Sequence, residues 1–150
     1  MPRLAMLVAC ERVIVDRMSS LPSIINVFQR MNIQLTDAPI AEKAVAPTRW
    51  AIFSLWVHTP EEIDVEFTQR IEIVGADGEK FADATTKFKT TTADDLQSKN
   101  HLDVLGIPIW REGFVKVKIW LDGVADSSSE YQFFVKYLAK ETNAEAAVVH

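Results

Sequence analysis

The sequence is poor in the residues that mark most metal-binding and disulfide-bonded proteins. Cys10 is the only cysteine, so an intrachain disulfide is excluded, as in most proteins of reducing compartments. The histidines His58, His101 and His150 lie far apart, without the spacing of a metal site. No run of about 18 apolar residues occurs, so no membrane span is predicted. These absences predict a cytoplasmic protein that contacts no membrane and holds no metal or cofactor.

Basic charge is also scarce. The chain has 16 Lys and Arg residues against 21 Asp and Glu residues, which gives a net charge of -5 and a pI near 5.2. Nucleic-acid-binding surfaces need clustered basic residues, so the composition predicts that no nucleic acid is a partner. The acidic residues are spread over several loops rather than gathered into the roughly six to eight oxygen ligands that calcium takes. We therefore expect no calcium site.

Alternation of apolar and polar residues is the clearest positive signal. In residues 114–121, every second residue from Val115 onward is apolar, whereas Lys116 and Lys118 lie between them. An Asp-Gly pair follows directly. This period of two is typical of a half-buried β-strand that ends in a turn.

Similar runs recur about eight times, with Gly, Pro, Asp or Ser at the breaks. Residues 48–58 and 65–74 are the strongest of the others. Short strands at regular spacing are typical of a sandwich or barrel. We predict an all-β protein: a single antiparallel β-sandwich of about eight strands, with an immunoglobulin-like or C2-like Greek key and only short helical turns. Residues 1–139 form this domain, and residues 140–150 form a C-terminal helix or flexible tail.

Four short motifs follow one another along the chain: Cys10-Glu11-Arg12-Val13, Ser23-Ile24-Ile25-Asn26-Val27-Phe28, the Asp77-Gly78 turn, and the segment that runs from Gly113-Phe114 to Leu121-Asp122-Gly123. In this order they resemble an uncharacterised bacterial and phage-associated family of small β-sandwich domains of unknown function. The resemblance covers nearly the whole chain. It implies a compact β-sandwich without an assigned activity, and it supplies no catalytic residues.

Aromatic residues supply the candidate binding surface. If the odd-numbered residues of the 48–58 strand, such as Phe53 and Leu55, face the core, the even-numbered ones face outward. By the same rule, the even-numbered residues of the 114–121 strand face outward beside two lysines. The candidate binding or interface residues are Trp50, Trp56, His58, Phe114 and Trp120. Outward aromatic residues lower solubility unless something covers them.

Three kinds of cover are compatible with such a surface. A second copy of the chain or another protein would bury it, since aromatic residues are enriched at interfaces. The chain's own segments 36–47 or 140–150 would cover it instead. A sugar or other flat ligand would stack on the rings. We expect the first: a non-enzymatic interaction or structural module that forms a homo-oligomer or docks to another protein.

Two other functions stay open. A carbohydrate-binding or small-ligand-binding sandwich that uses the same rings is the alternative. A hydrolase built from His58 or His101 with nearby carboxylates is a third hypothesis, because catalytic triads are spatial rather than sequential. No motif supports that third hypothesis, so the sequence predicts that the chain is not an enzyme and has no catalytic residue.

Overall fold

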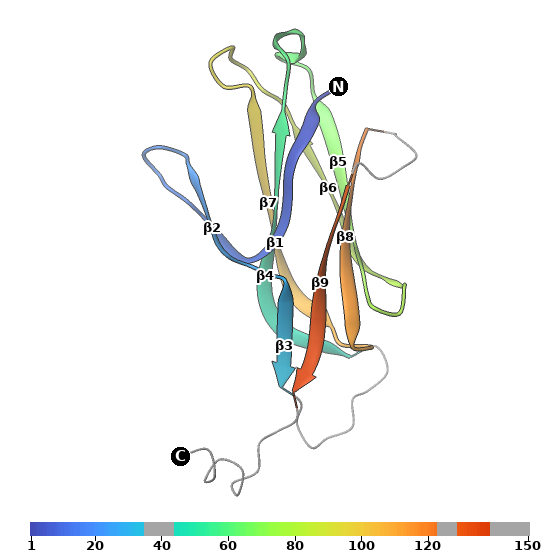
Figure 1. Cartoon of the computed structure of the whole chain (residues 1–150). Coiled ribbons are helices and arrows are strands. Elements are labelled where there is room, and N and C mark those ends of the chain that lie inside the picture. The colour runs from blue at the N-terminus through green and yellow to red at the C-terminus, as the bar shows by residue number, and fades with distance from the viewer. Residues whose placement is uncertain (35–43, 123–128, 139–150) are drawn as a thin grey trace, which may run out of the picture.

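A computed structural model shows an all-β protein built from two sheets, which confirms the predicted fold class (Figure 1). The structure describes residues 1–34, 44–122 and 129–138. The strands of these residues are β1 (Arg3–Val15), β2 (Pro22–Val27), β3 (Arg30–Gln34), β4 (Val45–Val57), β5 (Phe67–Val74), β6 (Lys80–Phe88), β7 (Gln97–Pro108), β8 (Gly113–Leu121) and β9 (Ser129–Leu138). The helical element of these residues is the 3-10 turn η1 (Pro60–Glu62).

The two sheets have different strand orders. The four-stranded sheet has the order β2-β1-β4-β7, and the five-stranded sheet has the order β3-β9-β8-β5-β6. Neighbouring strands are antiparallel except at one edge, where β3 runs parallel to β9. The strands β4 and β8 therefore lie inside their sheets, whereas β6 and β7 are edge strands.

The core lies between the sheets and is almost wholly apolar. On β8, Val115, Val117 and Ile119 are all 0% exposed and face the other sheet, as the period of two predicts. Phe133 and Val135 of the neighbouring β9 continue the same layer. The five-stranded sheet thus keeps its apolar side inside and turns its polar side outward.

The β4 strand of the other sheet is oriented opposite to the expectation. Trp50 and Trp56 are each 1% exposed and belong to the core, so the prediction that they face outward is wrong. Phe53 is also buried, at 4% exposed, but it lies outside this core cluster, and Leu55 is half-buried. The strand is apolar on both sides, so its alternation did not reveal which side faces inward.

Glycine marks two positions where the backbone needs it. Gly78 adopts a φ of +85° in the turn between β5 and β6, which confirms the predicted hairpin. Gly106 in β7 has a φ of +103°, and a Cβ there would lie 2.7 Å from Cγ1 of Val45. Gly106 therefore permits the close approach of β4 and β7 at their ends.

The start of one strand differs from its prediction, and two predicted segments lie outside the residues that the structure describes. The strand β4 begins at Val45, a few residues earlier than the predicted run of 48–58. The predicted helix or tail at 140–150 and most of the covering segment 36–47 lie outside the described residues. Over the residues that the structure describes, no helix has the length and apolar character needed to cross a bilayer.

Candidate functional site

The structure separates the five candidate residues into two groups. Trp50, Trp56 and His58 lie in the interior near the four-stranded sheet. Phe114 and Trp120 lie on β8 and face outward, because their neighbours at odd positions are buried. The predicted single aromatic surface therefore does not exist, but its β8 part does.

The two buried tryptophans are fixed by hydrogen bonds as well as by packing. Trp50 Nε1 donates to the carbonyl oxygen of Gly106 at 2.7 Å. Trp56 Nε1 donates to Oε1 of Gln69 at 2.8 Å, and the hydroxyl of Ser54 donates to the same oxygen at 2.9 Å. A buried indole or hydroxyl needs such a partner, and Gln69 supplies it from the opposite sheet. These rings stabilise the fold and offer no binding surface.

His58 occupies a similar structural position. Its side chain is 3% exposed, and its ring lies 5.7 Å from the rings of both Phe67 and Phe88. Nε2 lies 2.7 Å from the hydroxyl of Ser98. Burial lowers the pKa of His58, and the nearby Glu62 opposes this effect only in part. The imidazole is therefore held neutral, with Nδ1 lacking a hydrogen-bond partner among the described residues.

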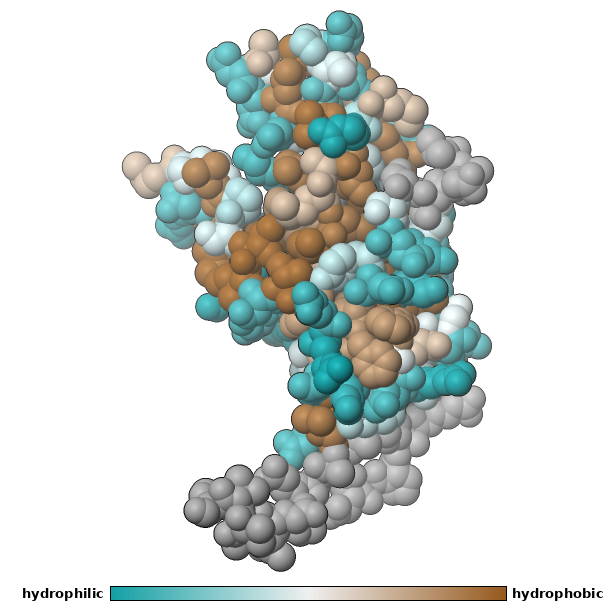
Figure 2. Space-filling view, in the orientation of Figure 1, coloured by the Kyte–Doolittle hydropathy of each residue, from teal (hydrophilic) through white to brown (hydrophobic). Residues whose placement is uncertain are grey.

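The outward side of β8 forms part of a surface that combines aromatic rings with basic side chains. We call this surface the basic-aromatic face. Its aromatic members come from β8 and β9, and its basic members come from β3, β5, β6, β8 and β9. They are Phe114, Trp120, Phe134, Arg30, Arg70, Lys87, Lys116, Lys118 and Lys136. In Figure 2 a small light-brown island among teal atoms covers the lower part of β8 and β9.

One end of the basic-aromatic face carries a pair of phenylalanines. Phe114 and Phe134 are directly opposite in the antiparallel register of β8 and β9. Their ring centroids are 5.2 Å apart, and the rings are nearly perpendicular at 85°. Phe114 is 49% exposed. Arg30 of β3 lies opposite Phe134 on its other side. A large apolar surface thus faces solvent next to a cation.

The other end carries a tryptophan covered by an arginine. Trp120 is directly opposite Arg70 in the register of β8 and β5. The guanidinium carbon of Arg70 lies 4.3 Å from the centroid of the indole ring, which is a cation–π contact. Arg70 Nη1 is also 3.4 Å from a carboxylate oxygen of Glu72. The guanidinium is therefore held against the ring and still has exposed surface.

Lysines occupy the β8 positions between these two ends. Lys116 and Lys118 are half-buried, as expected for stems that pack on the sheet while the ammonium groups reach water. Neither forms an ion pair with another described residue. Glu72 and Glu130 flank Lys118 in the register, and the edge pairs Lys80–Asp83 and Lys87–Glu66 measure 2.7 and 3.5 Å. Of the basic members of the face, Arg30, Lys116, Lys118 and Lys136 have no ion-pair partner within the part of the chain that the structure describes, and nearby carboxylates partly offset their charge.

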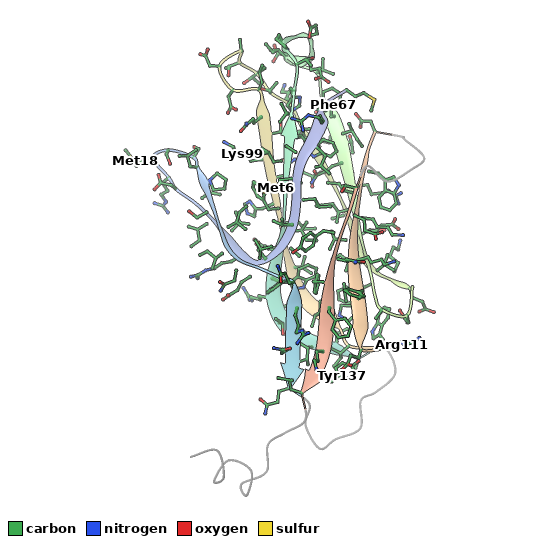
Figure 3. The ribbon with its side chains drawn as sticks, in the orientation of Figure 1. Met6, Met18, Phe67, Lys99, Arg111 and Tyr137 are labelled. Carbon is green, nitrogen blue, oxygen red and sulfur yellow. The ribbon has the colours of Figure 1, made fainter. Side chains whose placement is uncertain are left out.

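The outward side of the four-stranded sheet has the opposite character. Met6 and Val27 are exposed, Leu105 is 68% exposed, and Leu55 is half-buried on the same side. A brown area covers β1 and β2 in Figure 2. Figure 3 shows Met6 on β1, and Met18 at the tip of the β1–β2 hairpin. The charged residues on this side include Lys99 and Asp103, which lie on the edge strand β7.

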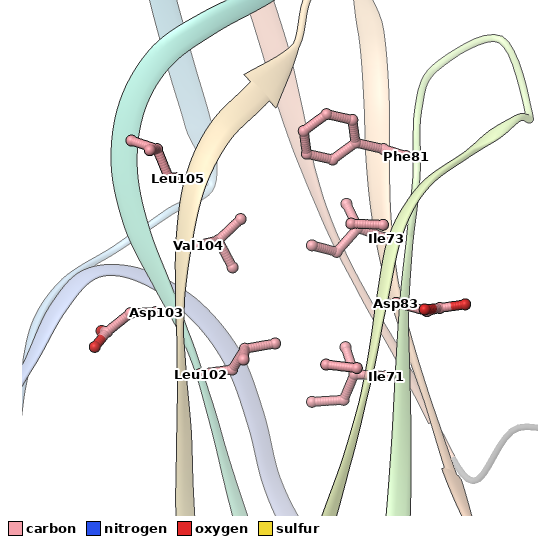
Figure 4. Close-up of a pocket in the computed structure, with 10 residues that line it drawn as sticks. Ile71, Ile73, Phe81, Asp83, Leu102, Asp103, Val104 and Leu105 are labelled. Carbon is pink, nitrogen blue, oxygen red and sulfur yellow. The ribbon is translucent and has the colours of Figure 1, made fainter.

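A cavity of about 240 Å³ opens between the edge strands β6 and β7. Leu102 and Val104 point into it from one sheet, and Ile71, Ile73 and Phe81 from the other (Figure 4). The carboxylates of Asp83 and Asp103 point away from the gap. The cavity is an apolar opening at the side of the core, without a polar group to orient a reactant.

The described residues contain no group of three or more His, Cys, Asp or Glu side chains that could hold a metal ion. Cys10 is buried, and burial raises the pKa of its thiol, with the charge of Asp103 as a smaller cause. A buried thiol of this kind is a poor nucleophile. The basic-aromatic face is therefore the surface with the richest binding chemistry.

Comparison with known proteins gives a likeness to solved structures but none to a curated sequence. No family model and no curated protein sequence matches the chain. The fold is similar to part of the alkylpurine DNA glycosylase AlkC of Pseudomonas fluorescens, bound to DNA that contains an abasic site analog. The TM-score is 0.47 at 11% sequence identity, and the match covers 90% of this chain and 30% of the glycosylase.

That neighbour is an enzyme in complex with DNA, and it contradicts three of the expectations from sequence. The first is that the chain is a non-enzymatic protein-interaction or structural module, with carbohydrate or small-ligand binding as the alternative. The second is that it is not an enzyme. The third is that its partner is a second copy or another protein and not a nucleic acid. We set all three aside. The likeness is too distant to assign an activity or a ligand to this chain, so the function has to be argued from its own surface.

Sequence reasoning missed several members of the basic-aromatic face. Phe134, Arg70 and Arg30 join Phe114 and Trp120 only through the register of neighbouring strands. Position 134 did carry a signal, since apolar and polar residues alternate in residues 130–137, as is typical of a strand. The alternation of this run and of residues 114–121 alone does not fix how the two runs align with each other.

Proposed function

We propose that this chain binds nucleic acid through the basic-aromatic face of its five-stranded sheet. The observation that supports the proposal is the gathering of Arg30, Lys116, Lys118 and Lys136 beside exposed aromatic rings, in a chain whose net charge is -5. Lysine and arginine neutralise phosphates, and aromatic rings stack on bases. Sheets that present both kinds of side chain on one open face are used for this purpose in common RNA-binding modules.

The distribution of charge supports a local rather than a global attraction. A protein with an acidic average can attract a polyanion only where its cations gather, because charges farther away than about 8–10 Å are screened at physiological salt. Lys116 and Lys118 lie near the middle of the sheet, on its central strand. The neighbouring carboxylates Glu72 and Glu130 weaken the attraction, so we expect an affinity that falls steeply as salt rises.

The test is a titration of fluorescently labelled oligonucleotides, followed by anisotropy at about 50 and 200 mM salt. The informative variant is the double substitution Lys116→Gln and Lys118→Gln, which removes two charges and keeps a polar side chain at each position. The matched control is Lys99→Gln, because Lys99 is an exposed lysine on the outward side of the other sheet.

We expect the double variant to bind more weakly and to show a smaller dependence on salt, with the slope reduced by about one for each phosphate that is no longer neutralised. The Lys99→Gln variant should bind like the wild type. A wild-type dissociation constant weaker than about 10⁻⁴ M at the lower salt concentration, beyond the usual range of non-specific binding, contradicts the proposal. Equal reductions in affinity for the double variant and the control contradict the assignment to this face.

A further inference from the structure

We infer that the nucleic acid bound by the basic-aromatic face is an unpaired strand, whose bases stack on two platforms of the sheet. The inference rests on the proposed function and specifies its substrate class. It comes from the aromatic members of the face rather than from its charge. DNA and RNA share the chemistry involved, which is a stackable base on a phosphate backbone.

The first platform is the Phe114–Phe134 pair. Phe114 is 49% exposed. An exposed apolar ring on a sheet is typical of a site that another molecule covers. Phe134 abuts it edge-to-face with centroids 5.2 Å apart, which fixes the ring of Phe114 against the sheet. A ring that is both exposed and held in place can accept a base at little cost in side-chain entropy.

The second platform is Arg70 on Trp120. The guanidinium lies 4.3 Å from the indole centroid, and the Arg70 side chain is 48% exposed. Bases stack on guanidinium planes as well as on aromatic rings. Glu72 and Trp120 together hold the guanidinium in place, so its free side forms a flat cationic surface.

The spacing of the platforms fits a short strand. Phe114 and Trp120 are six residues apart on β8, which corresponds to about 20 Å at roughly 3.3 Å per residue. Lys116 and Lys118 face outward between them and lie where the connecting phosphates would pass. A footprint of about four nucleotides, the lower end of known single-strand sites, matches this arrangement.

A double helix matches it poorly. Within a duplex the faces of the bases are already stacked, so an aromatic ring reaches a base face only by unstacking a step, at a cost of a few kcal/mol. Direct reading of base edges requires a helix or a two-stranded ribbon that enters a groove. The basic-aromatic face is instead the body of a five-stranded sheet, with its rings lying on the central strand β8 and on the neighbouring β9.

The experiment compares three labelled probes of about eight nucleotides: oligothymidylate, an abasic strand of the same length, and a duplex. The proteins are the wild type, Phe114→Leu with Phe134→Leu, and Trp120→Leu. Phe114→Tyr and Trp120→Phe are the matched controls, because each retains an aromatic ring. Melting curves establish that every variant is folded before titration.

We expect the wild type to prefer oligothymidylate over both other probes. Each leucine variant should bind oligothymidylate about 5- to 150-fold more weakly, corresponding to one stacked base, and should bind the abasic strand nearly as well as before. The ring-retaining controls should stay close to the wild type. Oligouridylate compared with oligodeoxyuridylate, which differs from it only in lacking the 2′-hydroxyl, identifies the sugar, and preferential binding of either strand over the duplex supports the inference.

Two results overturn the inference and are distinguishable from failure of the proposed function. If the duplex or the abasic strand binds as tightly as oligothymidylate, and only the lysine variant weakens binding, the face contacts backbone without bases. If the leucine variants match the wild type on every probe, the platforms are not used. Absence of binding to all probes overturns both the inference and the proposed function.

Discussion

The strands β4 and β8, each flanked on both sides within its own sheet, use tryptophan in opposite ways. On β4 the indoles of Trp50 and Trp56 point into the core, where each nitrogen has a hydrogen-bond acceptor. On β8 the indole of Trp120 points outward, and its nitrogen has no such buried acceptor among the described residues; Arg70 covers its ring instead. The inward side of β8 is filled by aliphatic residues, which leaves its aromatic residues outside.

The comparison shows that the residues on the neighbouring strands decide what chemistry the outward side of each sheet presents to solvent. On the four-stranded sheet the outward neighbours of β4 are apolar on β1, such as Met6, whereas on β7 they include the charged residues Lys99 and Asp103. On the five-stranded sheet the outward neighbours of β8 include charged residues on both flanking strands. The same two-residue period therefore places exposed aliphatic residues on the outward side of one sheet, and aromatic rings beside cations on the outward side of the other.

Replacing a buried indole should give the largest loss of stability and is the first test of this comparison. Trp56→Ala should lower the free energy of unfolding by about 3–5 kcal/mol, because it opens a core cavity and leaves Gln69 without one of its donors. Trp120→Ala should cost only about 0.5–1 kcal/mol, the range of an exposed cation–π contact. Urea denaturation measures both, and equal losses of stability would remove the distinction between the two strands.

The second test compares aliphatic residues of the same two strands, for which we expect smaller losses of stability. Ile119→Ala should cost about 2–5 kcal/mol, since Ile119 is 0% exposed. Leu55→Ala should cost nearer to 1 kcal/mol, because Leu55 is half-buried and lies on the outward side of β4. The reverse order in the same urea titration would show that the inward and outward sides of β4 have been exchanged.

The third test uses pH and the buried histidine that follows β4. Burial lowers the pKa of His58 in the folded state, whereas the unfolded chain has an ordinary value near 6.5. The unfolded state thus binds more protons between these two values, and stability falls as the pH drops below about 6.5. The decrease is at most about 1.4 kcal/mol per pH unit.

His58→Gln removes the titrating ring and should flatten this dependence between about pH 7 and pH 5, even if the variant is less stable throughout. Urea midpoints measured at each pH give the slope. An unchanged slope in the variant would assign the pH dependence to other groups and would indicate that His58 is not held neutral by its surroundings.

The smallest expected effect is on the surface of the five-stranded sheet. Phe114→Ser should change the free energy of unfolding by no more than about 0.5–1.5 kcal/mol, because it removes the edge-to-face interaction with Phe134. Its effect on binding of an unpaired strand should exceed its effect on stability. A decrease in stability as large as that of Trp56→Ala would place Phe114 in the core.

The sequence predicted β8 correctly because lysines mark one side of it. A charged side chain seldom lies in an apolar core, so Lys116 and Lys118 fixed the inward side as Val115, Val117 and Ile119. The β4 run offered only Ser54 and His58 as polar markers at its C-terminal end, and both are buried with partners in the interior. Those partners, Gln69 and Ser98, lie on other strands and cannot be identified from the β4 sequence alone.

The basic-aromatic face was predicted only in part for a related reason. Phe114 and Trp120 followed from one strand, but their neighbours depend on how β5, β9 and β3 align with β8. Alignment is a property of pairs of strands, and one residue of slip would move every side chain to the other side. The family resemblance suggested from the sequence motifs stays a prediction.

The parallel pairing of β3 with β9 also bears on the order in which the chain can fold during synthesis. The four strands of one sheet are complete once the ribosome has passed Pro108, whereas β3 must wait for the last strand, β9, before it has a partner. Contacts between such distant segments form slowly. Until β9 emerges, Trp50 lacks Phe133, the ring that packs edge-to-face against it, so the growing chain passes through a stage in which this indole is less covered.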